Sequence, residues 1–175
     1  MHIIYLAGNS LNNKTWIETV KSNFDSFSTG DILYYTHWQT GEKFLNFDIE
    51  SQKLSDLVKK QDNYCIFSKS IGSILALKSI YEKVCNPEKI IICGHPYNLA
   101  KELNLPIDDY LKSLAIPVIF IQNEFDPVYG FNKLKKTLKE NSPANYQLIK
   151  NPNNNTHDYV DYKNLTTITK QFFEN

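Results

Sequence analysis

The stretch Tyr64-Cys-Ile-Phe-Ser-Lys-Ser-Ile-Gly-Ser-Ile-Leu-Ala-Leu77 decides the fold of this chain. An apolar run of strand length ends at Phe67, and a run with helical spacing begins at Ile71, with only Ser-Lys-Ser between them. A junction this short turns sharply, so its central residue stands above the sheet with a strained backbone. The first N–H groups of the helix, and the positive end of its dipole, point at the same place. Ser70 is therefore the candidate nucleophile.

Strand-like and helix-like segments alternate along the whole chain. The predicted strands are the apolar runs His2–Leu6, Asp31–Thr36, Tyr64–Phe67, Lys89–Cys93, Val118–Gln122 and Tyr146–Ile149. The predicted helices are Thr15–Phe24, Ile49–Lys60, Ile71–Val84, Asp108–Leu114, Phe131–Glu140 and Tyr162–Phe173, and residues 37–41 are expected to form a loop. Continuous apolar strands separated by helices indicate an α/β fold: a mostly parallel six-stranded sheet in a three-layer αβα sandwich.

Length and composition limit the class of protein. With 175 residues the chain is long enough for one well-buried core, and we expect a single domain over residues 1–175. Lys+Arg and Asp+Glu both number 19, and this balance disfavours nucleic acid or an anionic membrane as a partner. Three cysteines without paired spacing indicate free thiols and a reducing, cytoplasmic compartment. No apolar run approaches membrane-spanning length.

Chemically versatile residues follow the predicted strands. In a parallel sheet, ligand sites lie beyond the carboxyl ends of the strands, so residues far apart in the sequence gather along one edge. The residues that follow the six strands in turn are Gly8-Asn9, His37-Trp38, Ser70, His95 to Tyr97, Asp126 and His157. This topology predicts one site built from several loops.

Three of these residues match the needs of nucleophilic catalysis. A serine hydroxyl needs a base to take its proton, and the base needs a third group to fix its tautomer. His157 after the last strand suits the first task, and Asp126 after the preceding strand suits the second. Other readings remain open: Asp126 as a cap of the next helix, Asp158 as the acid, or Ser68 as the nucleophile. Small residues at a strand-to-helix turn also occur for packing alone.

The motif Ser68-x-Ser70-x-Gly72 resembles the Gly-x-Ser-x-Gly elbow of the α/β-hydrolases, with Ser68 in place of the first glycine. The order Ser, Asp, His matches the order of that family, and the resemblance extends over nearly the whole chain. The two leading antiparallel strands and a large lid are missing, so the chain looks like the compact intracellular members of the family.

The resemblance also implies an oxyanion hole. Leu6-Ala7-Gly8-Asn9 is similar to the His-Gly oxyanion loop of the family, with Ala7 in place of histidine. The backbone N–H groups of Asn9 and Ile71 would then stabilise the oxyanion, and Gly8 would permit the close approach of the backbone. The two departures, Ser68 and Ala7, leave open a relaxed site in a non-catalytic binding or scaffold protein.

The leading hypothesis is a cofactor-free serine hydrolase that cleaves an ester of a small acyl substrate, with a thioester or an amide as less favoured substrates. Five loop residues are expected either to line the substrate pocket or to anchor their loops: His37, Trp38, His95, Tyr97 and Tyr129. No metal is expected, because the sequence has no metal-binding motif. A flavodoxin-like or nucleotide-binding domain is disfavoured, because residues 8–10 lack the further glycines of a dinucleotide fingerprint. The oligomeric state is not indicated.

Overall fold

The structure, a computed structural model, describes residues 1–174; Asn175, the last residue of the expected domain, lies outside the described residues. Six strands form one sheet in the order β2-β1-β3-β4-β5-β6, and every neighbouring pair is parallel. The strands are β1 His2–Leu6, β2 Thr29–Ile32, β3 Cys65–Lys69, β4 Ile90–Cys93, β5 Val118–Asn123 and β6 Tyr146–Asn151. The predicted α/β class is confirmed, and the sheet is fully parallel where the sequence predicted a mostly parallel one.

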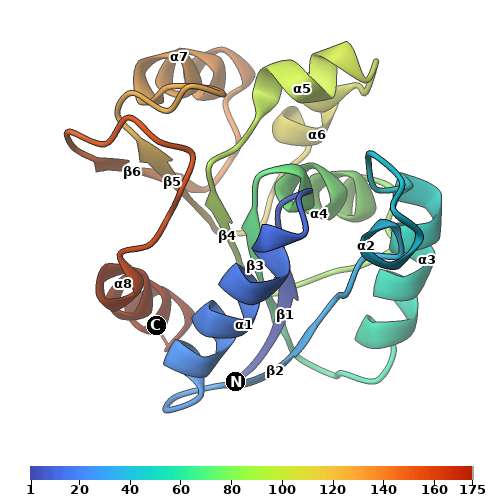
Figure 1. Ribbon diagram of the computed structural model, residues 1–175. Helices are drawn as coiled ribbons and strands as arrows, with labels where there is room; N and C mark the ends of the chain where they lie inside the picture. The colour runs from blue at the N-terminus through green and yellow to red at the C-terminus, as the bar shows by residue number, and fades with distance from the viewer. Residues whose placement is uncertain (175) are drawn as a thin grey trace.

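Helices cover both faces of this sheet. Helices α1 (Asn12–Phe24) and α8 (Tyr162–Glu174) contact each other on one face (Figure 1). On the other face lie α3 (Phe47–Val58), α4 (Ile71–Tyr81), α6 (Ile107–Lys112) and α7 (Phe131–Asn141) (Figure 1). Two short helices, α2 (His37–Thr40) and α5 (Tyr97–Glu102), lie on the connections after β2 and β4. The three-layer arrangement predicted from the sequence is therefore confirmed.

The core lies around the four central strands. Every residue of β3, β4 and β5 is buried, whereas the edge strands β2 and β6 are partly exposed. This burial explains the continuous apolar runs, because a central strand of a parallel sheet has a helix layer on each face. Helix α4 crosses the middle of the sheet and buries eight of its eleven residues, including Ile74 and Leu75.

Apart from shifts of a few residues at the ends of other elements, the structure differs from the prediction in three places. The second strand was expected over Asp31–Thr36 but spans Thr29–Ile32, because its partner β1 ends at Leu6 and the ladder ends with it. The loop expected at residues 37–41 contains one helical turn, which Gly41 ends at a φ of 77°. Helix α5 was missed because six residues are too few for a readable apolar period.

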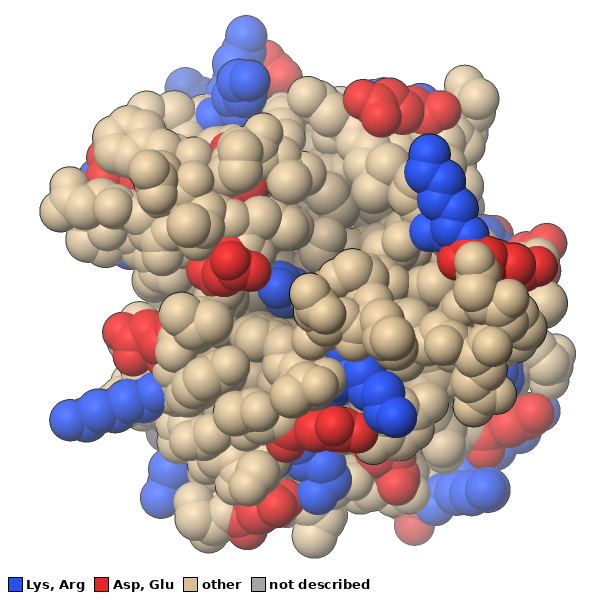
Figure 2. All heavy atoms as spheres, viewed as in Figure 1, with Lys and Arg blue, Asp and Glu red and all other residues tan. Residues whose placement is uncertain are grey.

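The strand register brings the carboxyl ends of the strands together. Leu6 pairs with Ser68, Lys69 with Cys93, and Asn123 with Asn151. The loops that follow these strands therefore meet at one edge of the sheet. On the face drawn in Figure 2, basic and acidic side chains are interspersed, in keeping with the equal numbers of the two.

Within residues 1–174, none of the helices combines the length and the apolar character needed to cross a bilayer.

Candidate active site

A chain of hydrogen bonds joins Ser70, His157 and Asp126. His157 Nε2 lies 2.9 Å from Ser70 Oγ, and His157 Nδ1 lies 2.8 Å from Asp126 Oδ2 and 3.0 Å from Oδ1. Because an ionised carboxylate only accepts hydrogen bonds, Nδ1 carries the imidazole proton and Nε2 is left to accept the proton of the serine hydroxyl. The structure thus brings together the three side chains that the sequence placed after three different strands.

Ser70 occupies a strained turn between β3 and α4. Its φ of 53° and ψ of −127° lie in a region that favours glycine. Three hydrogen bonds fix this backbone: the Ser70 N–H donates to Cys93 O at 2.9 Å, and Ser73 N and Ser73 Oγ donate to Ser70 O at 2.8 Å and 2.6 Å. The turn keeps the hydroxyl partly exposed above the sheet, as the strand-to-helix junction in the sequence indicated.

Two backbone N–H groups beside this turn are free to donate. Within residues 1–174 no protein group accepts a hydrogen bond from the N–H of Asn9 or of Ile71. The loops that carry them are in close contact, since a Cβ on Gly72 would lie 2.5 Å from Ala7 O. Glycine at position 72 is therefore required for the approach of α4 to the end of β1. The arrangement leaves two N–H donors available beside the Ser70 turn.

The Asp126 carboxylate accepts several hydrogen bonds besides those of His157. Val128 N donates to Oδ1 at 2.9 Å, and the Tyr159 hydroxyl donates to Oδ2 at 2.9 Å. Burial opposes ionisation of this carboxylate, but the hydrogen bond and charge attraction of His157, with the Val128 and Tyr159 bonds, outweigh it and lower the pKa of Asp126. The carboxylate therefore remains charged beside the imidazole.

Comparison with protein-family models found no match, and comparison with curated protein sequences found none either. Solved structures do match. An uncharacterised protein from Bacillus cereus superposes with a TM-score of 0.77 at 18% identity, over 99% of this chain and 60% of the other. Est1E from Butyrivibrio proteoclasticus, solved with ferulic acid bound, superposes with a TM-score of 0.76 at 13% identity, over 99% of this chain and 88% of Est1E. A cold-adapted esterase from an Arctic intertidal metagenomic library superposes with a TM-score of 0.71 at 11% identity, over 99% of this chain and 81% of the esterase.

The chain has the α/β-hydrolase fold. It spans three fifths of the length of the Bacillus cereus protein and most of the length of the two esterases. At these identities the likeness is one of fold, and the chemistry has to be argued from the site itself.

Two of the five expected pocket residues contact the loop that carries Asn9. His37 Nε2 and Trp38 Nε1 donate to Asn9 O, at 2.6 Å and 2.8 Å. His37 Nε2 and Trp38 Nε1 are therefore engaged with the chain itself, while His37 Nδ1 is buried without a hydrogen-bond partner among the described residues. His37 and Trp38 anchor the loop between β1 and α1 of this fold.

The other three expected pocket residues lie on the opposite side of Ser70. His95 is fully buried, with Nδ1 2.8 Å from Ser73 Oγ. The rings of Tyr97 and Tyr129 pack 5.4 Å apart, while their hydroxyls bond Asp108 and Thr137. His95 thus supports the first turn of α4 from inside the core, and the tyrosine pair joins the loops after β4 and β5.

Sequence reasoning missed the residues that hold the histidine loop. Asn123 Nδ2 donates to Thr156 O at 2.9 Å and to Asp158 O at 3.0 Å, on either side of His157. Asn123 N donates to the Tyr159 hydroxyl at 3.1 Å. Only their positions in the sequence could have indicated these residues: Asn123 ends β5, and Tyr159 follows His157 by two residues. Their partners became apparent only with the loops placed side by side.

A glycine makes room for the imidazole. Gly94 has a φ of 62°, and a Cβ there would lie 2.9 Å from His157 Cε1 and 2.6 Å from the Tyr159 ring. Any side chain at position 94 would both strain the backbone and displace His157 from Ser70.

A buried lysine lies next to the nucleophile in the sequence. Lys69 is 4% exposed, donates to Asn13 Oδ1 at 3.0 Å and has its ammonium 4.7 Å from the centre of the Trp16 ring. Burial lowers the pKa of Lys69, and the negative charges of Asp158 and Asp126 partly oppose that shift. The lysine therefore places a positive charge between the start of α1 and the histidine loop.

Ser68, the alternative nucleophile, and Asp158, the alternative acid, are placed less suitably than Ser70 and Asp126. Ser68 is fully buried and its hydroxyl donates to Ile91 O at 3.0 Å, so it faces the neighbouring strand. Asp158 is exposed, and the hydrogen bonds of His157 go to Asp126. The geometry favours Ser70 and Asp126 over both.

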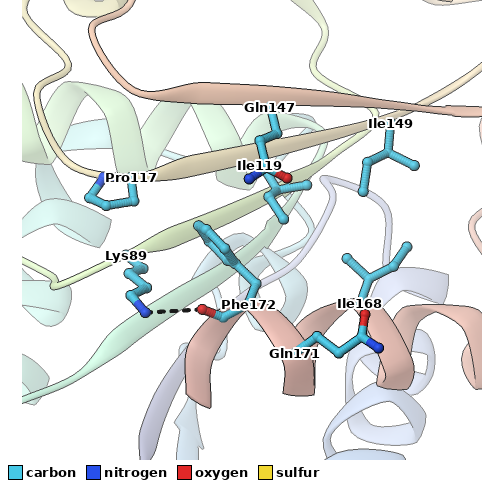
Figure 3. Close-up of a pocket in the computed structure, with 8 residues that line it drawn as sticks. All are labelled: Lys89, Pro117, Ile119, Gln147, Ile149, Ile168, Gln171 and Phe172. Carbon is cyan, nitrogen blue, oxygen red and sulfur yellow. Dashed lines mark hydrogen bonds between the residues drawn. The ribbon is translucent and has the colours of Figure 1, made fainter. Parts of the chain in front are cut away.

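The described residues hold no metal-ligand cluster, and one surface groove is remote from Ser70. Among residues 1–174, no three His, Cys, Asp or Glu side chains are grouped so as to hold a metal ion. A groove of about 480 Å³ lies between the sheet and α8, with Lys89, Pro117 and Phe172 among its lining residues (Figure 3). Lys89 and Pro117 precede β4 and β5, so this groove lies at the amino ends of the strands, away from Ser70.

Proposed function

We propose that the protein is a serine hydrolase that cleaves a carboxylic ester through an acyl-enzyme. The observation that carries the proposal is the unbroken hydrogen-bond chain from the Ser70 hydroxyl through His157 to Asp126, at a strained turn beside two free N–H groups. The esterases among the structural neighbours support the same class of reaction. A thioester or amide is a less favoured substrate of the same machinery.

The proposed acylation step uses the hydrogen-bond chain from Ser70 to Asp126. Ser70 Oγ attacks the carbonyl carbon of the ester while His157 Nε2 takes the hydroxyl proton. The N–H groups of Asn9 and Ile71 donate to the tetrahedral oxyanion, and Asp126 stabilises the imidazolium. The intermediate collapses, the C–O bond to the alcohol breaks, and the alcohol leaves with the proton from His157.

Deacylation repeats these steps with water. His157 takes a proton from a water molecule, which attacks the acyl carbon, and the same N–H groups stabilise the second oxyanion. Collapse of this intermediate returns the proton to Ser70 Oγ and releases the carboxylic acid. The connection between β4 and β5 carries only the short helices α5 and α6, and this favours small or exposed acyl groups.

The proposal includes a cytoplasmic location and a small-molecule substrate. Cys65, Cys85 and Cys93 are free, buried thiols, in keeping with a reducing compartment. The balance of 19 basic and 19 acidic residues gives no net field that would attract nucleic acid.

Active-site labelling tests the proposal. The wild-type protein should react with a fluorophosphonate probe and hydrolyse p-nitrophenyl esters, most rapidly those with short acyl chains. Ser70→Ala should abolish both, while Ser68→Ala, the matched control two residues earlier in β3, should keep the labelling. If the folded wild-type protein neither labels nor hydrolyses any member of the panel, it is a non-catalytic protein of this fold and the proposal is wrong.

A further inference from the structure

Three neighbouring aromatic residues donate hydrogen bonds to the loop that carries Asn9. The Tyr35 hydroxyl donates to Ala7 O at 2.9 Å. His37 Nε2 and Trp38 Nε1 both donate to Asn9 O. We call Tyr35, His37 and Trp38 the aromatic clamp, and residues 7–10 the oxyanion loop. Three donors of one short segment, residues 35–38, thus bond two carbonyls of another.

The bonds fall on particular peptide groups of the oxyanion loop. Ala7 O belongs to the peptide unit before Gly8, and Asn9 O belongs to the unit after Asn9. The unit between them, Gly8–Asn9, carries the N–H that is free to donate to an oxyanion. The clamp therefore fixes the two flanking peptide units, and the orientation of the middle N–H follows from theirs.

Further contacts make the clamp rigid. The three rings pack together, with centroids 5.6 Å apart for Tyr35 and His37 and 4.8 Å apart for Tyr35 and Trp38. Burial raises the pKa of the Tyr35 hydroxyl well above its usual range, so this group remains a donor. The segment itself is braced from α3, where the buried Glu50 accepts a hydrogen bond from Thr36 N at 2.6 Å.

The Asn9 side chain is bound as firmly as its backbone. Its Nδ2 donates to Lys43 O at 2.8 Å, and its Oδ1 accepts from Leu45 N at 3.2 Å. Residues 35–45 therefore surround Asn9 with four hydrogen bonds from outside its own loop. Such pre-organisation is needed where a donor must already point at developing charge, because reorienting it during the reaction would raise the barrier.

We infer that Tyr35, His37 and Trp38 are positioning residues of the oxyanion hole, which act on the transition state through the Asn9 peptide and do not bind the substrate. The inference rests on the proposed function. It also explains why histidine and tryptophan occupy positions 37 and 38, where His37 Nε2 and Trp38 Nε1 both donate to the same carbonyl, Asn9 O.

Kinetics of conservative variants test the clamp. His37→Leu and Trp38→Phe each remove one donor to Asn9 O and should lower kcat about 10-fold, and the double variant about 10²-fold, because a misplaced oxyanion donor costs that order of rate. KM should stay within about twofold, since the substrate is not contacted. His37→Gln, which keeps an N–H of similar reach, should restore most of the lost kcat.

Matched controls separate positioning from a loss of stability. Tyr35→Phe removes the bond to Ala7 O and should lower kcat, whereas Tyr5→Phe removes a comparable buried hydroxyl bond, to Ser28, and should not. A trifluoromethyl ketone, whose adduct with Ser70 carries an oxyanion, should lose affinity in parallel with kcat. The corresponding methyl ketone should bind the double variant about as well as the wild-type protein.

The outcomes distinguish the two proposals. An active wild-type protein whose double variant keeps its kcat, or raises only its KM, overturns the clamp and leaves the hydrolase intact. A wild-type protein that neither labels nor hydrolyses overturns the proposed function, and the role of the clamp in catalysis with it. A loss of kcat that His37→Gln does not restore, in a variant with a lowered melting temperature, indicates a structural role and contradicts the inference.

Discussion

Asp126 is the most densely bonded side chain of the site. It accepts from His157, from Val128 N and from the Tyr159 hydroxyl, and its carboxylate is fully buried. A residue that merely caps the following helix would not need the contacts to His157 and Tyr159. The density of bonds therefore assigns Asp126 to the orientation of His157 in the proposed mechanism.

Asp126→Asn should lower kcat by roughly 10⁴, because an amide in this place favours the wrong imidazole tautomer and cannot stabilise the imidazolium. Steady-state hydrolysis of an activated ester measures the effect, with KM expected to change little. Asp158→Asn, which alters the neighbouring carboxylate, should have a far smaller effect. The reverse ranking of the two variants would identify Asp158 as the acid.

For single residues, the sequence predicted the three members of the hydrogen-bond chain better than the residues that support them. Ser70, Asp126 and His157 follow strands, so the topology alone placed them at one edge. Asn123 and Gly94 act through atoms that touch the histidine loop, and those contacts depend on the conformation of a loop 30 or more residues away. His37 and Trp38 were placed at the right edge, but which atom each ring bonds could not be read from residue types.

Among the elements, helix α4 determines the distance between the nucleophile and the oxyanion loop. Its first turn passes so close to β1 that a Cβ at position 72 would lie 2.5 Å from Ala7 O and 2.7 Å from Leu6 O. Both are backbone atoms, which a small side-chain movement cannot clear. The helix axis and the end of β1 must therefore separate if any larger residue replaces Gly72.

Gly72→Ala should destabilise the fold by about 1–3 kcal/mol, as overpacking does, and should lower kcat about 10²-fold by moving Ile71 N and Asn9 N apart. Urea unfolding and ester hydrolysis measure the two effects. Ser79→Ala, which breaks a buried bond to Ser51 further along α4, provides a control with lower stability and intact activity. Equal activity of the two variants would show that the spacing at Gly72 does not matter.

Element boundaries were predictable where an apolar run filled the element. The central strands β4 and β5 match the expected runs to within one residue, because their burial on both faces leaves no polar ambiguity. The second strand was predicted too late in the sequence because Leu33 and Tyr35 extended the apolar run, although neither residue belongs to the strand. Leu33 is buried beyond the end of the ladder, and Tyr35 belongs to the clamp.

For the molecule as a whole, the buried His95 links stability to pH. Ser73 Oγ donates its proton to Ser70 O, so His95 Nδ1 carries the hydrogen of the bond to Ser73, and Nε2 has no partner. Protonation would bury an unpaired N–H, and burial lowers the pKa of His95 from 6.5 to about 3. Between these values the unfolded chain binds a proton that the folded chain does not, so stability falls as the pH falls.

His95→Asn, whose amide can still donate to Ser73, removes this titration. Between pH 6.5 and 3 the wild-type free energy of unfolding should fall more steeply than that of the variant, by up to about 1.4 kcal/mol per pH unit. Above pH 6.5 the difference between the two should be constant. Urea unfolding at a series of pH values measures both curves, and parallel curves throughout would contradict the assignment.

The order of the strands in the sheet could not be predicted from any single segment of the sequence. Order β2-β1-β3-β4-β5 is shared with flavodoxin-like proteins, so strand order alone does not separate the two folds. The residues that the order brings together make that distinction, since a serine, a histidine and an aspartate meet where a flavodoxin-like protein would bind its cofactor. Fold class could thus be predicted from periodicity, and the type of site from the loops.

The histidine loop follows β6, an outer strand with partly exposed residues. Outer strands detach more readily than central ones, so thermal fraying at this margin would carry the general base away while the nucleophile stayed in place. Under the proposed mechanism, catalysis then fails at a lower temperature than that at which the core melts, and a nascent polypeptide acquires its reactivity only when β6 and the loop after it have docked.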